Sequence, residues 1–173
     1  MANTYIQIGS TVTVGAGGAS SIDFTSIPST YTDLVVKLSL RAAASNTDQT
    51  INLRFNGSSA SSYAAVRVYG TGSAAGSDGD ASTTSINMYS ISGNSATANT
   101  FGNAEIYVPN YAGSTNKSVS ADVVSEDNAT RALASLTAGL WSNTAAINQI
   151  TILVSGTTFV QYSTASLYGI SKS

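Results

Sequence analysis

The chain has 173 residues and a formal net charge of −2, which is enough for a sizeable core, and we expect a single domain over residues 1–173. It contains no cysteine and no histidine, which excludes a disulfide framework, a Ser-His-Asp triad, a Cys-His pair and the common zinc sites. The seven Lys and Arg residues are scattered and no run of 18 apolar residues occurs, so we expect neither nucleic-acid binding nor a membrane span.

The N-terminal residues alternate between apolar and polar side chains and therefore predict one or two short strands. Residues 1–14 form either the first strand of the domain's own sheet or an arm that pairs with a neighbour's sheet edge through backbone hydrogen bonds. Met1 to Gln7 contain neither a basic region nor an apolar core, so we expect no signal peptide.

The clearest strand runs from Leu34 to Arg41, where apolar residues recur at every second position. Successive side chains of a strand point to opposite faces, so Leu34 and Leu38 are expected to lie in the core. Pro28 fixes its own φ and favours an extended residue before it, which indicates a turn ahead of this strand.

Further strands follow in the same pattern, with a strong turn signal at Asn56-Gly57. Leu133–Trp141 permits a helix as well, because Ala and Leu favour one, but Gly139 and the neighbouring pattern favour a strand. The predicted strands are Tyr5–Val14, Ile22–Phe24, Leu34–Arg41, Thr50–Asn56, Tyr63–Tyr69, Ile86–Ile91, Phe101–Val108, Val119–Val124, Leu133–Trp141, Ile147–Val154 and Thr158–Ile170.

About ten or eleven short strands with frequent turns and no helical crossover predict antiparallel sheets. The predicted fold is therefore all-β, an antiparallel jelly-roll-like β-sandwich.

Residues 70–84 are rich in Gly, Ser and Ala and predict a long loop, of a length that is usually functional or a contact site. Asp78 and Asp80 within it offer oxygens for calcium, or two carboxylates for glycoside hydrolysis. The segment lacks the spaced pattern of a calcium loop, and loop carboxylates are usually solvated turn formers. We therefore expect no catalytic residue, no metal site, no cofactor and no enzymatic activity.

The polar residues of this chain are mostly uncharged. Charged residues are 9% of the chain, whereas 29 residues are Ser and 21 are Thr. One interpretation is the Ser/Thr-rich surface common on extracellular β domains. The other is that much of the surface is buried in an assembly, because Lys and Glu, which number only three and two, are depleted at protein interfaces.

Aromatic and apolar residues near loops and at the N-terminus are candidates for such an interface, because tyrosine rings anchor protein contacts and stack on sugars. The alternative is that strand tyrosines are half-buried β-formers. The candidate interface residues are Tyr5, Ile6, Ile8, Tyr63, Tyr69, Tyr89 and Tyr111.

Three segments carry a family resemblance. They are Ile22-Asp-Phe-Thr-Ser-Ile-Pro-Ser-Thr-Tyr-Thr-Asp-Leu-Val-Val, Ile51-Asn-Leu-Arg-Phe-Asn-Gly followed by Tyr63, and the closing Ala165-Ser-Leu-Tyr-Gly-Ile. Together they resemble virion proteins of tailed bacteriophages, namely capsid-decoration, head-fibre and tail-fibre proteins. The family often has an acidic residue after Asn56-Gly57, where this chain has Ser58 and Ser59.

The resemblance implies a non-enzymatic β-sandwich module, usually trimeric, that is assembled in the host cytoplasm and released in the virion by lysis. The absence of a shaft or repeat favours a capsid decoration (cement) protein, with the major capsid protein or other virion proteins as partners. The alternative is a tail- or head-fibre adhesin module that recognises a host-surface glycan.

Overall fold

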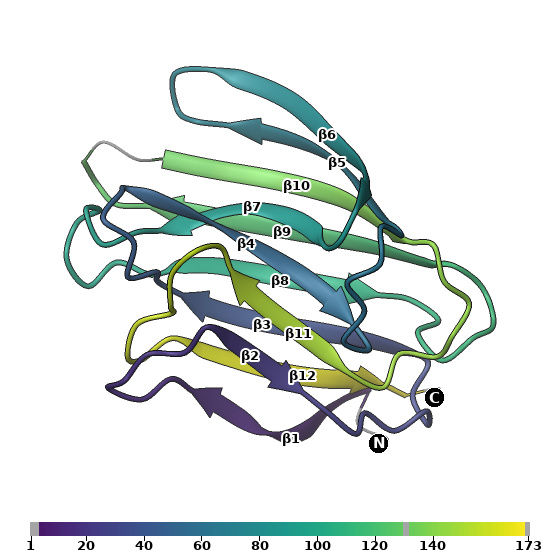
Figure 1. Ribbon diagram of the computed structural model, residues 1–173. Helices are drawn as coiled ribbons and strands as arrows, with labels where there is room; N and C mark the ends of the chain where they lie inside the picture. The colour runs from purple at the N-terminus through teal and green to yellow at the C-terminus, as the bar shows by residue number, and fades with distance from the viewer. Residues whose placement is uncertain (1–3, 130–131, 172–173) are drawn as a thin grey trace.

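The computed structural model describes residues 4–129 and 132–171, and these residues form an all-β fold of twelve antiparallel strands without a helix. Two sheets face each other as the layers of a β-sandwich (Figure 1). The strands are β1 (Tyr5–Thr13), β2 (Ser21–Phe24), β3 (Asp33–Leu40), β4 (Asp48–Phe55), β5 (Tyr63–Gly70), β6 (Ala75–Thr83), β7 (Ile86–Ser92), β8 (Gly102–Val108), β9 (Lys117–Glu126), β10 (Ala132–Trp141), β11 (Ile150–Val154) and β12 (Thr164–Ile170). The predicted antiparallel β-sandwich is confirmed.

The two sheets differ in width. The large sheet has eight strands in the order β1-β12-β3-β8-β9-β10-β5-β6, and the small sheet has four in the order β2-β11-β4-β7. The inner side of β5 contacts β7 of the small sheet, whereas β6, at the edge of the large sheet, lies beyond it (Figure 1). Part of the large sheet therefore has no partner layer.

The core fills the space between the sheets, and β3 runs through its centre. Leu34, Val36, Leu38 and Leu40 are all at most 4% exposed, so the predicted inward face of this strand is confirmed. Other large side chains of the core come from both sheets and the loops between them, among them Ile22, Ile51, Leu53, Phe55, Tyr63, Ile86, Tyr111, Trp141 and Phe159.

The predicted loop over residues 70–84 is wrong, because Ala75–Thr83 forms strand β6 at the edge of the large sheet. Its Gly and Asp residues have low β-propensity, so this segment carries no local strand signal. Backbone pairing with β5 and two ion pairs to that strand stabilise β6 in spite of its low β-propensity. Two other predicted strands, over residues 147–154 and 158–170, begin too early, because β11 and β12 start at Ile150 and Thr164.

Strand β1 pairs with β12 of its own chain, from Tyr5 opposite Ile170 to Thr13 opposite Thr164. The first and last strands, β1 and β12, consequently lie side by side (Figure 1). Within the described residues, the N-terminal segment is thus the first strand of its own sheet, which is one of the two interpretations above. The other interpretation, an arm that pairs with a neighbour's sheet edge, gains no support from this pairing. Residues 1–3 of the segment lie outside the described residues.

Arg67 ties three strands together on the inner side of β5. It is 3% exposed, and its Nε and Nη1 lie 2.6 Å from Asp78 Oδ1 and 2.8 Å from Asp80 Oδ2 of β6. Nη1 also donates to the carbonyl of Asn87 in β7 at 3.0 Å. Burial disfavours the charge, but the hydrogen bonds with Asp80 and Asp78 outweigh it, so the pKa of the guanidinium is above its usual value. The carboxylates thereby anchor an edge strand with little intrinsic β-propensity.

Lys117, at the start of β9, is 1% exposed, and its ammonium donates to the carbonyls of Gly113, Thr115 and Thr144. Burial lowers its pKa below the usual 10.5. Between the folded-state pKa and 10.5, the unfolded chain binds this proton and the folded chain does not. The contribution of Lys117 to the free energy of unfolding therefore rises with pH through this window.

We expect the wild-type protein to gain stability relative to Lys117→Met as pH rises from about 8 to about 10.5, because the variant has no proton to release at this site. Urea unfolding of both proteins at the two pH values measures the difference, in which the titration of the other groups largely cancels. A difference that stays constant or falls with pH would contradict the lowered pKa.

Candidate functional site

The two carboxylates considered above as catalysts or calcium ligands both form ion pairs with an arginine of the same chain. Asp78 and Asp80 both contact Arg67, as described above. Among residues 4–129 and 132–171, no cluster of three or more His, Cys, Asp or Glu could hold a metal ion. The same residues contain no helix that is long and apolar enough to cross a membrane.

The most distinctive surface is the outer face of the large sheet, the side turned away from the small sheet. Cross-strand pairing arranges its side chains in rows that run across neighbouring strands. One row is Ser166, Lys37, Glu105, Asp122, Leu136, Val68 and Ser77, and the next is Tyr168, Val35, Tyr107, Ser120, Ala138, Val66 and Gly79. Each row begins polar or aromatic at β12 and becomes apolar at β10 and β5.

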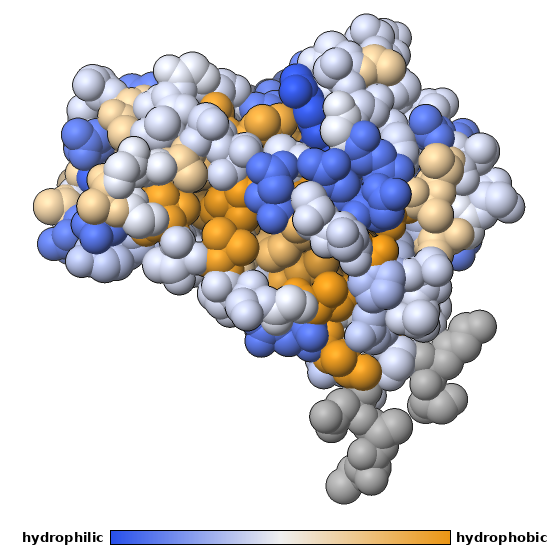
Figure 2. All heavy atoms as spheres, turned by 60° about the horizontal axis from the view of Figure 1, so that its bottom comes forward, coloured by the Kyte–Doolittle hydropathy of each residue, from blue (hydrophilic) through white to orange (hydrophobic). Residues whose placement is uncertain are grey.

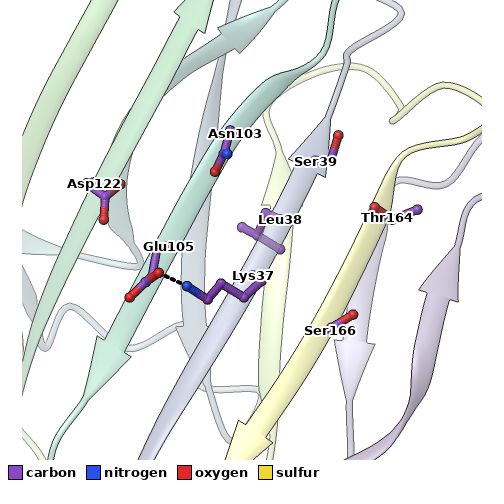
Figure 3. Close-up of a pocket in the computed structure, with 8 residues that line it drawn as sticks. All are labelled: Lys37, Leu38, Ser39, Asn103, Glu105, Asp122, Thr164 and Ser166. Atoms are coloured by element: carbon purple, nitrogen blue, oxygen red, sulfur yellow. Dashed lines mark hydrogen bonds and ion pairs between the residues drawn. The ribbon is translucent and has the colours of Figure 1, made fainter. Parts of the chain in front are cut away.

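The polar half contains a shallow hollow of about 380 Å³ over β12, β3, β8 and β9. Figure 3 shows Lys37 of β3 reaching Glu105 of β8 across it, with Asp122 of β9 on the far side and Leu38 directed away from the other side chains. The hydrogen bond with Glu105 is the main cause that raises the pKa of Lys37. Both partners are well exposed to solvent, so this pair contributes little to stability.

Tyrosines cover the end of the outer face nearest the chain termini. Tyr168 and Tyr107 flank Val35 on the neighbouring strands, and Val35 is only 1% exposed although it points outward. The Tyr107 hydroxyl donates to Asp33 at 2.9 Å, and this hydrogen bond raises the tyrosine pKa. Tyr5 of β1 packs on Tyr168 with a ring-centroid distance of 6.2 Å.

The apolar half lies over β9, β10 and β5, and its large side chains are exposed. The exposed fractions are 61% for Val66, 52% for Val68, 43% for Val124, 55% for Leu136 and 39% for Leu140. Smaller residues of the same face complete this surface, which we name the apolar patch: Val66, Val68, Val124, Leu136 and Leu140 with Ala64, Gly70, Ala134 and Ala138.

Two hollows border the large side chains of the apolar patch. One, of about 490 Å³, lies around Gly70, Ala134 and Val124. The other, of about 400 Å³, lies around Ala64 and Ala138. Contiguous apolar surfaces of this kind are typical of the interaction sites of proteins.

The local fold exposes these residues because the opposite side of the same strands meets the small sheet. On β10, Ser135, Thr137 and Trp141 are buried, and on β5 Arg67 is buried between the exposed Val66 and Val68. Alternation then sends the remaining side chains outward. Strand alternation separates the residues of β5 and β10 into these two sets, but it does not indicate that the aliphatic set faces solvent.

The candidate interface residues chosen from the sequence fall into three groups. Tyr5 and Ile6 are exposed, at 51% and 36%, and Ile8 is half-buried. All three lie on β1, at the side of the sandwich that Figure 2 brings forward, where apolar residues form part of the surface. These three remain candidates for a contact.

Tyr69 and Tyr89 are half-buried and stack on each other with ring centroids 4.7 Å apart. Tyr89 has a φ of 78°, an unusual backbone conformation for an aromatic residue. The two side chains come together on the β6–β7 side of the molecule, away from β1.

Tyr63 and Tyr111 were wrong as surface candidates, because they are 1% and 0% exposed. The Tyr63 hydroxyl accepts from the Phe55 amide at 3.1 Å and donates to the Ser58 carbonyl at 3.2 Å. The Tyr111 hydroxyl donates to the carbonyl of Pro28. Burial raises the pKa of both phenols. These tyrosines are core residues whose polar ends are satisfied by backbone groups.

No protein-family model and no curated protein matches the sequence. Among solved structures, galectin LEC-6 of Caenorhabditis elegans is similar over 94% of this chain and 96% of that chain, with 10% sequence identity and a TM-score of 0.36. A likeness at this level carries no information about ligand or function.

Proposed function

We propose that this chain is a non-enzymatic structural protein of a tailed-bacteriophage virion, namely a capsid decoration protein that docks on the capsid lattice. The observation that carries the proposal is the apolar patch, whose five large aliphatic side chains are 39–61% exposed in the single chain. Surface of this kind is normally covered by a protein partner, so the domain completes its burial in an assembly.

Two sequence features support the same role. The three segments that resemble phage virion proteins extend from Ile22 to Ile170, across almost the whole sandwich. The surface carries few Lys and Glu residues, which are the residues depleted at interfaces. Trimer formation is part of the proposal through the resemblance, and the virion is its proposed location.

Mass spectrometry of purified particles of the phage that encodes the chain tests this role. We expect the protein in many copies per particle, with its density on the capsid in a particle map. Purified protein added to capsids that lack it should restore that density. Density confined to the tail tip would favour the glycan-binding fibre instead, and absence from the particle would contradict both virion roles.

A further inference from the structure

We propose that the free edge of β1 is an interface between two copies of this chain, in which the two β1 strands pair antiparallel and join the large sheets edge to edge. This edge and the apolar patch lie toward opposite ends of the large sheet, with β12, β3 and β8 between them. The pairing goes beyond the proposed function, because docking on a capsid does not by itself require contact between these edges.

Four strands lie at the edges of the two sheets, and β1 differs from the other three. It is nine residues long, contains no charged residue and no proline, and is exposed at every position except Ile8 and Val12. Strand β6 carries Asp78 and Asp80, β2 has only four residues including Asp23, and no residue of β7 is exposed. Short length, charge and cover usually protect an edge against pairing with another strand, and β1 has none of these.

The backbone groups of β1 alternate between its own sheet and the free edge. The carbonyl of Thr4 accepts from the Ser171 amide at 3.1 Å, so this pair is a hydrogen-bonded pair of the ladder with β12. Hydrogen-bonded and non-hydrogen-bonded pairs alternate, so Ile6 also bonds to β12, whereas the N–H and C=O groups of Tyr5 and Gln7 point away from it. Within residues 4–129 and 132–171, β1 pairs with no strand besides β12, and Figure 1 shows it as the outermost strand at the bottom of the molecule.

The regular part of β1 sets the register of the contact. Its one-to-one pairing with β12 runs from Tyr5 to Ile8, and Gly9, with a φ of 70°, lies in the bulge that follows. A two-fold axis perpendicular to the sheet and beside Ile6 places Ile6 opposite the partner's Ile6 and Tyr5 opposite the partner's Gln7. The rotation keeps the outer faces of both sheets on the same side, as in any antiparallel pair. Tyr5 and Gln7 of the two copies then exchange both N–H···O bonds of a hydrogen-bonded pair.

The side chains of β1 fit a second copy of the same strand. Ile8 lies opposite the buried Leu167, so Ile6, two residues away, also faces the inner side, where Figure 2 shows apolar residues at the surface. Ile6 is 36% exposed, and the axis brings it against the partner's Ile6. On the outer face Tyr5 meets the partner's Gln7, which carries no charge. Two copies therefore meet without repulsion, whereas a charged partner strand would find no counter-charge on β1.

The size of the contact suits a reversible association. About five residues of each strand take part and span about 17 Å, so the contact is smaller than a standard interface. An isologous contact joins copies in pairs. It yields a dimer if it acts alone and a hexamer if the protein also forms trimers through another surface.

Analytical ultracentrifugation of the full chain at concentrations up to about 1 mM tests the contact, because even a Kd near 1 mM then gives a sizeable dimer fraction. We expect the wild-type protein to associate reversibly into an even number of copies. Gln7→Pro removes an N–H that only the partner uses, so it should weaken association at least about tenfold while the monomer keeps its thermal transition. Gln7→Val keeps this N–H and should associate like the wild-type protein.

Cysteine pairing tests the register, since the chain has no cysteine of its own. The Cα atoms of a non-hydrogen-bonded pair are about 4.5 Å apart, which a disulfide spans, so oxidised Ile6→Cys protein should form a covalent dimer. Thr13→Cys, an exposed position of β1 beyond the bulge, should give a much lower yield.

Three results would each overturn the pairing. They are wild-type protein that stays monomeric or forms only trimers up to about 1 mM, a folded Gln7→Pro protein that associates like Gln7→Val, and equal covalent dimer yields from Ile6→Cys and Thr13→Cys. The cysteine comparison decides the outcome if Gln7→Pro does not fold. Absence of the protein from virions, with the β1 pairing intact, would overturn only the proposed function.

Discussion

Leu38→Asp is expected to abolish cooperative folding. Leu38 is 4% exposed in the middle of β3, with Leu34, Val36 and Leu40 on the same buried face. A carboxylate there has no partner and must either stay charged in the core or take up a proton at a raised pKa. The cost is several kcal/mol, comparable to the whole stability of about 5–15 kcal/mol of an ordinary domain.

Circular dichroism during thermal unfolding measures this effect. Ser39→Asp is the matched control, because Ser39 is the next residue of the same strand and is exposed on the outer face. It should unfold within about 0.5 kcal/mol of the wild-type protein. A soluble Leu38→Asp protein with a cooperative transition close to that of the control would show that β3 is oriented the other way.

Trp141→Ala should lower the free energy of unfolding by about 3–5 kcal/mol. The indole is 1% exposed at the end of β10 and packs against Phe55 and Tyr63, with ring centroids 5.5 Å and 6.1 Å away. Removing it leaves a cavity between the two sheets, because Phe55 belongs to the small sheet and Tyr63 to the large one. Chemical unfolding with urea gives the difference directly.

Leu140→Ala is the control that makes this result specific. Leu140 precedes Trp141 but is 39% exposed in the apolar patch, so its truncation should cost about 1 kcal/mol or less in the monomer. Leu140 and Trp141 are both large and apolar, and hydrophobicity alone does not separate them. Equal destabilisation by the two substitutions would contradict the outward orientation of Leu140.

Strand β3 shows what alternation predicts well. Leu34–Arg41 has aliphatic residues at every second position and mostly polar residues between them, so one face is clearly the better one to bury. The small sheet covers that face, and the predicted core is confirmed. Two residues of the outward set are nevertheless buried. Val35 is flanked by tyrosines of the neighbouring strands, and Arg41, 6% exposed, donates to the backbone carbonyls of Thr97, Thr100 and Ala96.

In strands β5 and β10, alternation alone does not predict which face is buried. Each has a purely aliphatic set, such as Val66 and Val68, and a mixed set that includes Arg67 or Trp141. The mixed set faces inward, because Asp78 and Asp80 neutralise Arg67 and aromatic residues of both sheets pack around Trp141. These compensating groups are far from β10 in the sequence or come from β6, which carries no strand signal of its own.

By itself, the sequence determined the class of fold, most of the strands and the lack of histidine- and cysteine-based chemistry, because period-two alternation and residue identity are local properties. For strands with apolar residues on both faces, such as β5 and β10, only the tertiary structure decided which face is covered. The period is the same for either face, and burial depends on whether a second layer lies opposite. A four-stranded sheet lies against an eight-stranded one, and cross-strand pairing brings Val66, Val124 and Leu136 together on the outer face that no layer covers.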